Sequence, residues 1–175
     1  MILRKAEIND VAGITIVHIE TWRTTYKGIV PDEIIQNLSS REKDEKWSQM
    51  LKEMIKTEIY YVAEDENGKI IGFAVGGLER SGDPTYKGEL MGIYILKEYQ
   101  NIGIGRTLIK IIVTELLKLG INNMLVWVLK ENPYKTFYEK IGGKVIKERL
   151  HEKLKLPVLA YGWDNLEDLL NKLEN

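Results

Sequence analysis

Apolar and polar positions follow two periods along this chain, the two-residue period of strands and the 3.6-residue period of helices. Runs rich in Val, Ile and Tyr predict strands at 2–6, 58–65, 70–78, 89–96, 123–129, 144–149 and 157–163. Helical spacing predicts helices at about 11–22, 40–55, 105–119, 133–141 and 166–173. Strands and helices in this alternation are typical of an α/β fold.

Turn and capping residues set the expected boundaries. Asn67-Gly68 is a hairpin signal between two predicted strands. Asn9 or Asp10 can cap the first helix. Ser39 with Glu42 has the spacing of a capping box and predicts the start of the second helix.

Composition narrows the class of protein. A chain of 175 residues suits a single domain over 1–175, with 44% hydrophobic and 29% charged residues. The net charge of -1 gives no reason to expect nucleic acid as a partner. The absence of cysteine excludes disulfides and cysteine nucleophiles, and the isolated His18 and His151 make a poor case for a metal. No apolar stretch has the length of a membrane span, so we expect a cytoplasmic protein that does not bind membranes.

A glycine-bearing segment between a predicted strand and a predicted helix is the strongest chemical signal. It runs Gln100-Asn101-Ile102-Gly103-Ile104-Gly105 and is followed by Arg106. Unpaired N–H groups at a helix start attract anions, and glycines let a phosphate come close. The Rossmann fingerprint would need a glycine where Leu108 stands, and a Walker A loop would need a Gly-Lys-Ser/Thr ending. A pyrophosphate cradle and a plain strand–helix turn are both open on these residues alone.

Two segments resemble the GNAT superfamily of N-acetyltransferases. Residues 89–108, ELMGIYILKEYQNIGIGRTL, resemble its acetyl-CoA motif, and residues 132–143, NPYKTFYEKIGG, resemble its second motif. Gly143 departs from the phenylalanine that is usual there. The resemblance implies a mixed, mostly antiparallel central sheet with helices on both faces, splayed into a V at the acetyl-CoA site.

The same resemblance implies which residues hold acetyl-CoA. Strand residues around Tyr94 would offer backbone groups to the pantetheine arm, and the glycine segment would hold the pyrophosphate. Asn132 and Lys135 would contact the pantetheine or order their loop. The implied cofactor-binding set is Ile93, Tyr94, Ile95, Gln100, Asn101, Ile102, Gly103, Ile104, Gly105, Arg106, Asn132 and Lys135.

Tyr138 and Glu89 are the implied catalytic residues. A free tyrosine has a pKa of ~10, so Tyr138 can protonate the departing thiolate at neutral pH. Glu89 would take the proton of the attacking amine, through water. On the residues alone, Tyr138 is a core aromatic beside Phe137 on an amphipathic helix, and Glu89 is as readily a solvated charge at a strand end. Without a cysteine to carry the acetyl group, direct attack in a ternary complex is expected.

The acceptor is less well indicated. Trp22 and Tyr26 fall where the family's loop overhangs the acceptor site, although a loop packed onto the core explains them equally well. Acidic residues flank that loop at Glu20, Asp32 and Glu33, which favours a cationic small amine, among them a polyamine. The alternatives are a protein lysine or N-terminus, or a non-catalytic acyl-CoA-binding domain. By resemblance only, a homodimer is also an expectation.

Overall fold

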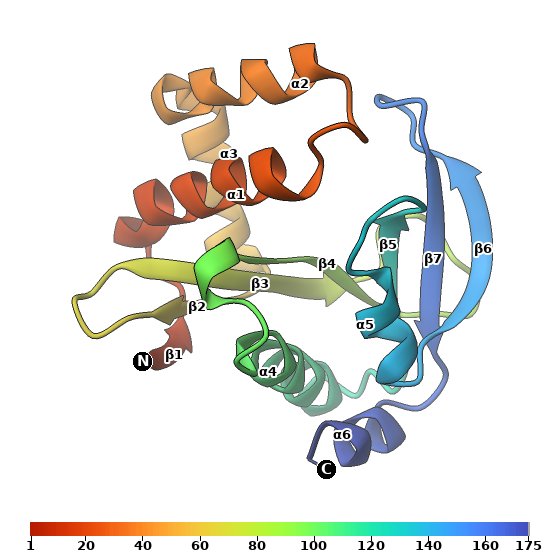
Figure 1. Cartoon of the computed structure of the whole chain (residues 1–175). Helices are drawn as coiled ribbons and strands as arrows, with labels where there is room; N and C mark the ends of the chain where they lie inside the picture. The colour runs from red at the N-terminus through yellow and green to blue at the C-terminus, as the bar shows by residue number, and fades with distance from the viewer. Residues whose placement is uncertain (175) are drawn as a thin grey trace. The chain divides into compact units, whose positions relative to one another are not determined.

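The computed structural model describes residues 1–174, with the backbone alone for residues 42 and 43. Short 3-10 turns at Ile8–Asp10, Leu38–Lys43 and Lys97–Tyr99 accompany the main elements. The strands are β1 (Ile2–Lys5), β2 (Ile59–Glu64), β3 (Ile70–Leu78), β4 (Gly88–Ile95), β5 (Met124–Leu129), β6 (Lys144–Leu150) and β7 (Pro157–Trp163). The α-helices are α1 (Val11–Thr25), α2 (Asp32–Asn37), α3 (Glu45–Thr57), α4 (Ile104–Lys118), α5 (Lys135–Lys140) and α6 (Leu166–Glu174) (Figure 1).

The seven strands pair in the order β1-β2-β3-β4-β5-β7-β6. β1 pairs antiparallel with β2, and β7 pairs antiparallel with both β5 and β6. β4 and β5 are parallel, and their ladder consists of Gly88↔Met124 and Glu89↔Leu125. The mixed, mostly antiparallel sheet confirms the predicted fold class. The splaying predicted from the sequence would begin where this short ladder ends, in the residues of β4 after Glu89.

Two compact units make up the chain. One comprises Met1–Val75 with Ile93–Ile109, and the other Gly76–Gly92 with Lys110–Asn175. β3, β4 and α4 each contribute residues to both units. Within residues 1–174, no helix combines the length and the apolar character that a membrane span requires. The single domain over 1–175 stays a prediction.

In the first unit, α1 lies close against β3 (Figure 1). A Cβ on Gly13 would stand 2.8 Å from Ile70 Cγ1. The helix can therefore approach the strand this closely only because residue 13 has no side chain. Ile14 and Val17 on the same helix are fully buried, as the apolar spacing predicts.

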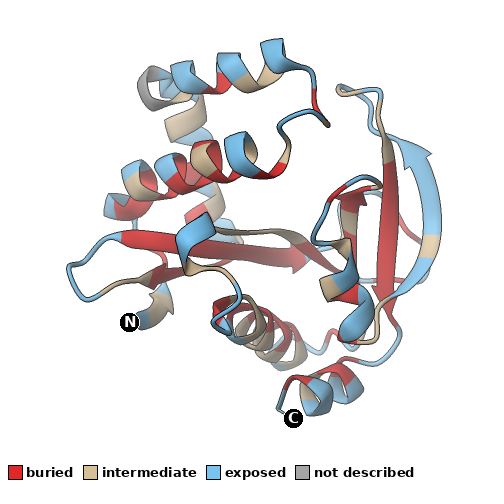
Figure 2. Ribbon diagram, in the orientation of Figure 1, coloured by how far each residue is buried: buried red, intermediate tan, exposed pale blue. Residues whose placement is uncertain are grey.

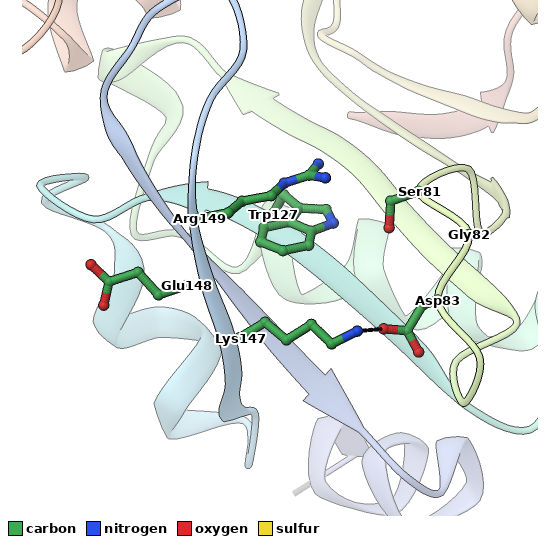
Figure 3. Close-up of a pocket in the computed structure, with 7 residues that line it drawn as sticks. All are labelled: Ser81, Gly82, Asp83, Trp127, Lys147, Glu148 and Arg149. Carbon is green, nitrogen blue, oxygen red and sulfur yellow. Dashed lines mark hydrogen bonds and ion pairs between the residues drawn. The ribbon is translucent and has the colours of Figure 1, made fainter.

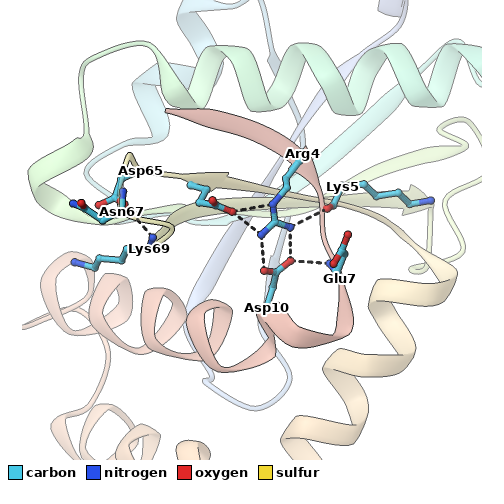
Figure 4. A network of polar contacts seen from close by, with 8 residues as sticks. Arg4, Lys5, Glu7, Asp10, Asp65, Asn67 and Lys69 are labelled. Carbon is cyan, nitrogen blue, oxygen red and sulfur yellow. Dashed lines mark hydrogen bonds and ion pairs between the residues drawn. The ribbon is translucent and has the colours of Figure 1, made fainter.

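A polar network around Arg4 ties the start of the chain together (Figure 4). Its guanidinium donates to both carboxylate oxygens of Asp10, at 2.7 and 2.8 Å, and to Glu64 at 2.7 Å. Asp10 also accepts the backbone N–H of Glu7 at 2.8 Å. The hydrogen bond from Arg4 is the main cause that holds the pKa of Asp10 below its usual value. Asp10 precedes α1, but its carboxylate serves these partners and makes no capping bond to that helix.

The predicted start of the second helix was wrong. Ser39 lies inside the 3-10 turn Leu38–Lys43, where its hydroxyl donates to the carbonyl oxygen of Gln36 at 2.7 Å. The capping residue of α3 is Asp44, whose carboxylate accepts N–H bonds from Lys46 at 2.9 Å and Trp47 at 3.4 Å. The capping-box pattern failed because residues 32–43 are already helical, so Ser39 has no free helix start to cap.

In the second unit, β7 is buried along almost its whole length while β6 is exposed (Figure 2). β6 is the edge strand at this end of the sheet, which accounts for its exposure. A bulge between Val145 and Lys147 interrupts its ladder with β7. Trp163 at the end of β7 is 4% exposed and donates its indole N–H to the carbonyl oxygen of Ile141 at 3.2 Å.

Candidate active site

The glycine segment lies in the first unit, where it follows the 3-10 turn Lys97–Tyr99 and runs into the first turn of α4. Gln100 anchors it by donating its side-chain amide to the carbonyl oxygen of Ile95 at 2.8 Å. Asn101 (φ 62°) and Gly103 (φ 92°) adopt the left-handed conformation that turns the chain into the helix. A Cβ on Gly103 would meet no atom within 4 Å. The residues thus form an open loop at a helix N-terminus, which suits an anionic group.

The side chain of Tyr94, near the end of β4, packs against two other aromatic rings. Its ring centroid lies 5.0 Å from that of His18 and 5.0 Å from that of Phe73. Burial raises the pKa of the Tyr94 hydroxyl. A Cβ on Gly72 would stand 3.0 Å from the Tyr94 carbonyl oxygen, so β3 and β4 are closely packed there. The Tyr94 side chain is thus occupied by packing, and contact between the backbone of residues 93–95 and acetyl-CoA stays a prediction.

Trp22 and Tyr26, the predicted acceptor residues, close the end of α1. Their ring centroids lie 5.0 Å apart in an edge-on arrangement. The Tyr26 N–H bonds the carbonyl oxygen of Trp22 at 3.0 Å, and Gly28 (φ 78°) turns the chain after it. Trp22 also lies 5.6 Å from the ring of His18. The structure thus joins these two residues to the aromatic cluster around His18.

His18 is buried, a feature that its isolated position in the sequence did not reveal. It is 8% exposed, and its ring lies 5.0 Å from those of Trp47 and Tyr94. The Arg41 guanidinium lies 3.2 Å from His18 Nδ1 and stacks 4.2 Å over Trp47. Burial, reinforced by the charge of Arg41, lowers the pKa of His18 to about 3. His18 is therefore neutral near pH 7, and its Nδ1 can accept a hydrogen bond from Arg41.

Glu89 lies in the second unit, at the paired start of β4. It is 6% exposed, so the alternative that Glu89 is a solvated charge at the end of a strand is wrong. Arg80 donates to both of its carboxylate oxygens, at 2.9 and 3.1 Å, and the Arg80 backbone N–H adds a third bond at 3.1 Å. No sequence pattern pointed to Arg80, because the loop that returns it to Glu89 has no regular pattern.

Tyr138 lies on α5 within an aromatic group of the second unit. It is 7% exposed, and its ring lies 5.5 Å from Phe137, 5.8 Å from Tyr161 and 6.3 Å from Trp163. A Cβ on Gly143 would stand 2.7 Å from Trp163, so the tryptophan fills the space beside this glycine. The departure at Gly143 therefore has a packing cause.

Asn132 and Lys135 shape the turn before α5. The Asn132 side-chain oxygen accepts the N–H of Tyr134 at 2.8 Å, and Lys135 Nζ donates to the carbonyl oxygen of Lys130 at 2.7 Å. Asn132 is 8% exposed. Both side chains thus order the loop that leads to Tyr138.

Residues 19–142 match the Acetyltransferase (GNAT) family. The chain belongs to this family. The match contains the glycine segment, Glu89 and Tyr138. A GNAT acetyltransferase takes its acetyl group from acetyl-CoA, and this chain is an acetyl-CoA-dependent N-acetyltransferase.

Relatives of this GNAT acetyltransferase match most of the length of the chain. It is 36% identical over 170 residues to the uncharacterized N-acetyltransferase YuaI of Bacillus subtilis, covering 95% of both chains. It is 30% identical over 148 residues to the spermidine N(1)-acetyltransferase of Thermoplasma acidophilum, covering 82% of this chain and 88% of that one. The crystal structure of the PaiA N-acetyltransferase of Thermoplasma acidophilum in complex with coenzyme A matches with a TM-score of 0.73 at 23% identity, over 92% of this chain and 96% of that one.

Proposed function

We propose that this acetyltransferase moves the acetyl group directly onto a primary amine of a small molecule, within a ternary complex. The supporting observation is the buried Glu89 carboxylate in a chain that has no cysteine. A buried carboxylate suits proton abstraction, and without a thiol the simplest route is attack by the amine itself.

The residues of the first unit fit a nucleotide-linked thioester. The loop of residues 100–106 presents the start of α4, and its glycine at 103 leaves open space for a phosphate. We assign these residues to the pyrophosphate and the backbone of 93–95 to the pantetheine arm. Asn132 and Lys135 order the loop before α5. Acetyl-CoA supplies an acetyl group that its thioester activates toward nucleophiles.

Proton transfers at Glu89 and Tyr138 complete the proposed reaction. An alkyl amine has a pKa of ~10 and is mostly protonated at neutral pH, so it first gives a proton to Glu89 through water. Its nitrogen then forms a bond to the thioester carbon and releases a second proton to solvent, and the carbon–sulfur bond breaks. The departing thiolate takes the hydroxyl proton of Tyr138. The products are the amide and the free thiol, and exchange with solvent returns the proton from Glu89 to Tyr138.

The acceptor class rests on weaker support. A relative named for spermidine favours a polyamine, and so do the acidic residues near the end of α1. Of these, Glu20 is already paired with Arg23 at 2.7 Å, which leaves Asp32 and Glu33 in the first turn of α2. A protein lysine or N-terminus is the alternative acceptor.

Steady-state kinetics test the direct attack. Initial velocities with acetyl-CoA and an amine varied together should give intersecting lines. Protein incubated with acetyl-CoA alone should keep its mass. Parallel lines, with a bound acetyl group that the amine removes, would replace direct attack with an acetyl-enzyme.

A further inference from the structure

A pocket of about 370 Å³ in the second unit belongs to none of the roles assigned above. Its walls come from the loop after β3, from Trp127 on β5, and from Lys147, Glu148 and Arg149 on β6 (Figure 3). All of these segments lie within one compact unit.

The acidic side chains of this pocket are already neutralised. Asp83 has a side chain only 2% exposed, and it accepts the backbone N–H groups of Thr85 and Tyr86 together with the Lys147 ammonium. The hydrogen bond from Lys147 is the main cause that lowers the pKa of Asp83 to about 2. Glu148 is paired with Lys130, outside the pocket, at 2.7 Å. Neither carboxylate is left to attract a cation.

Two donors of the pocket lack an acceptor. The guanidinium of the exposed Arg149 stacks 4.0 Å over the Trp127 ring and is open to solvent, and Arg149 forms no ion pair with any residue that the structure describes. Trp127 Nε1 is buried and has no hydrogen-bond partner among those same residues. An indole nitrogen can only donate, and a buried donor without an acceptor is unfavourable. Figure 3 shows this nitrogen on the side of the ring that faces Ser81 and Gly82. One uncompensated cation and one unsatisfied N–H together suit an anion.

The strand register places this pocket on the same face of the sheet as Glu89. Glu89 pairs with Leu125, and Trp127 follows two residues later on the same strand. Directly paired residues and residues two apart share a face, and Lys147 joins Trp127 through Ala160. With 3.3 Å per residue and 4.8 Å between strands, the Cα atoms of Glu89 and Trp127 are roughly 8 Å apart.

We propose that this pocket binds a carboxylate of the acceptor while its primary amine reacts near Glu89. The inference rests on the proposed acetylation of a small primary amine, and among such amines it favours aminocarboxylates over the polyamines suggested by the relative named for spermidine. Arg149 supplies the charge and Trp127 the directed N–H bond. A polyamine has no group that satisfies these two donors.

Acceptors matched in length test the carboxylate. We would compare kcat/KM for 5-aminopentanoate and for pentylamine, and then for aminoalkanoates from 3-aminopropanoate to 6-aminohexanoate. We expect a preference for the carboxylate-bearing amine, with an optimum chain length because pocket and base are at a fixed separation. Equal kcat/KM for the two amines, or spermidine above every aminoalkanoate, would overturn the inference.

Two variants test whether Arg149 and Trp127 cause the preference for the carboxylate-bearing amine. Arg149→Ala should lower the ratio of kcat/KM for 5-aminopentanoate to that for pentylamine by about 10-fold or more, since bonds to charged groups are the stronger ones. Trp127→Phe keeps the ring and removes the N–H, and it should lower the ratio by a smaller factor. Lys153→Ala, at an exposed lysine in the β6–β7 turn, removes one charge from the same hairpin as a control. A ratio that changes equally in Arg149→Ala and Lys153→Ala would overturn the inference.

A binding measurement separates this inference from the proposed function. Calorimetric titration of the wild type and of Arg149→Ala with 5-aminopentanoate requires no turnover. If no amine is acetylated but binding depends on Arg149, the pocket stands and the proposed function fails. If amines are acetylated and binding is the same in both proteins, the pocket inference fails and the proposed function stands.

Discussion

Both carboxylate oxygens of Glu89 are bound by one guanidinium, that of Arg80, at 2.9 and 3.1 Å. Glu89 is buried, whereas the Arg80 side chain is 54% exposed. A carboxylate held in this way has a fixed orientation, and the arginine occupies sites that an incoming ammonium or water would use. To act as the base, Glu89 must therefore accept a proton while both of its oxygens already accept hydrogen bonds from Arg80.

Glu89→Gln should lower kcat by about 100-fold or more at pH 7 if Glu89 is the base. The defect should narrow as the pH approaches 10, because the free amine with a pKa of ~10 then needs no base. The profile of kcat from pH 7 to 10 checks this, with Glu167→Gln on α6 as a control. A loss of the same size at every pH would assign Glu89 a packing role.

Tyr138→Phe should lower kcat by about 100-fold or more while acetyl-CoA binding changes little, since only the donated proton is lost. Tyr161→Phe is the matched control. That ring stacks on Tyr138 and its hydroxyl donates to Glu139 at 2.9 Å, away from the proposed reaction. Single-turnover rates and calorimetry separate the two effects. Equal kcat in Tyr138→Phe and the wild type would show that Tyr138 has only a packing role.

His18 should make stability depend on pH below neutrality. Its pKa is about 3 in the folded protein and ~6.5 when unfolded, so the unfolded chain binds the extra proton between these values. Stability therefore falls as the pH is lowered through this window, by about 2 kcal/mol from pH 7 to pH 5.

Urea unfolding at pH 7 and pH 5 measures this dependence. His18→Gln should lose most of it, whereas His151→Gln, at an exposed position, should keep it. The same pH dependence in all three proteins would show that His18 titrates normally in the folded state.

Gly143→Ala should destabilise the fold by about 1–3 kcal/mol, as overpacking does. The new Cβ would stand 2.7 Å from the Trp163 ring and 2.9 Å from the Tyr138 carbonyl oxygen, and the backbone atom cannot easily move. Lys144→Ala, at the exposed neighbour, should stay within about 0.5 kcal/mol of the wild type. Urea unfolding of both variants checks this, and a neutral Gly143→Ala would contradict the tight packing.

Local signals predicted much of the fold. The turn at Asn67-Gly68 was expected, and the structure has Gly68 at φ 80° with the Asp65 carboxylate accepting the N–H groups of Asn67 and Lys69. Ser39 shows the opposite case. Its capping pattern lies inside a 3-10 turn that continues directly from α2, and the pattern itself does not tell the two situations apart.

The candidate site also contains features that local sequence signals predicted and features that they did not. The segment of residues 100–106 was predictable because its residues are contiguous and contain the start of α4 at Ile104. Arg80 beside Glu89, and Arg149 over Trp127, were not predictable. Each pair depends on strand register and on the path of a loop, which no local pattern records. His18 was missed because a single histidine on a helix gives no sign of the aromatic rings that surround it.

The acceptor assay tests the central proposal most directly. Release of CoA from acetyl-CoA should be followed with aminoalkanoates, spermidine, other diamines, aminoglycosides, free amino acids and short lysine peptides. We expect a small primary amine to be acetylated with a kcat/KM well above that of every peptide. A peptide with kcat/KM well above every small amine would contradict it and make this enzyme a protein acetyltransferase.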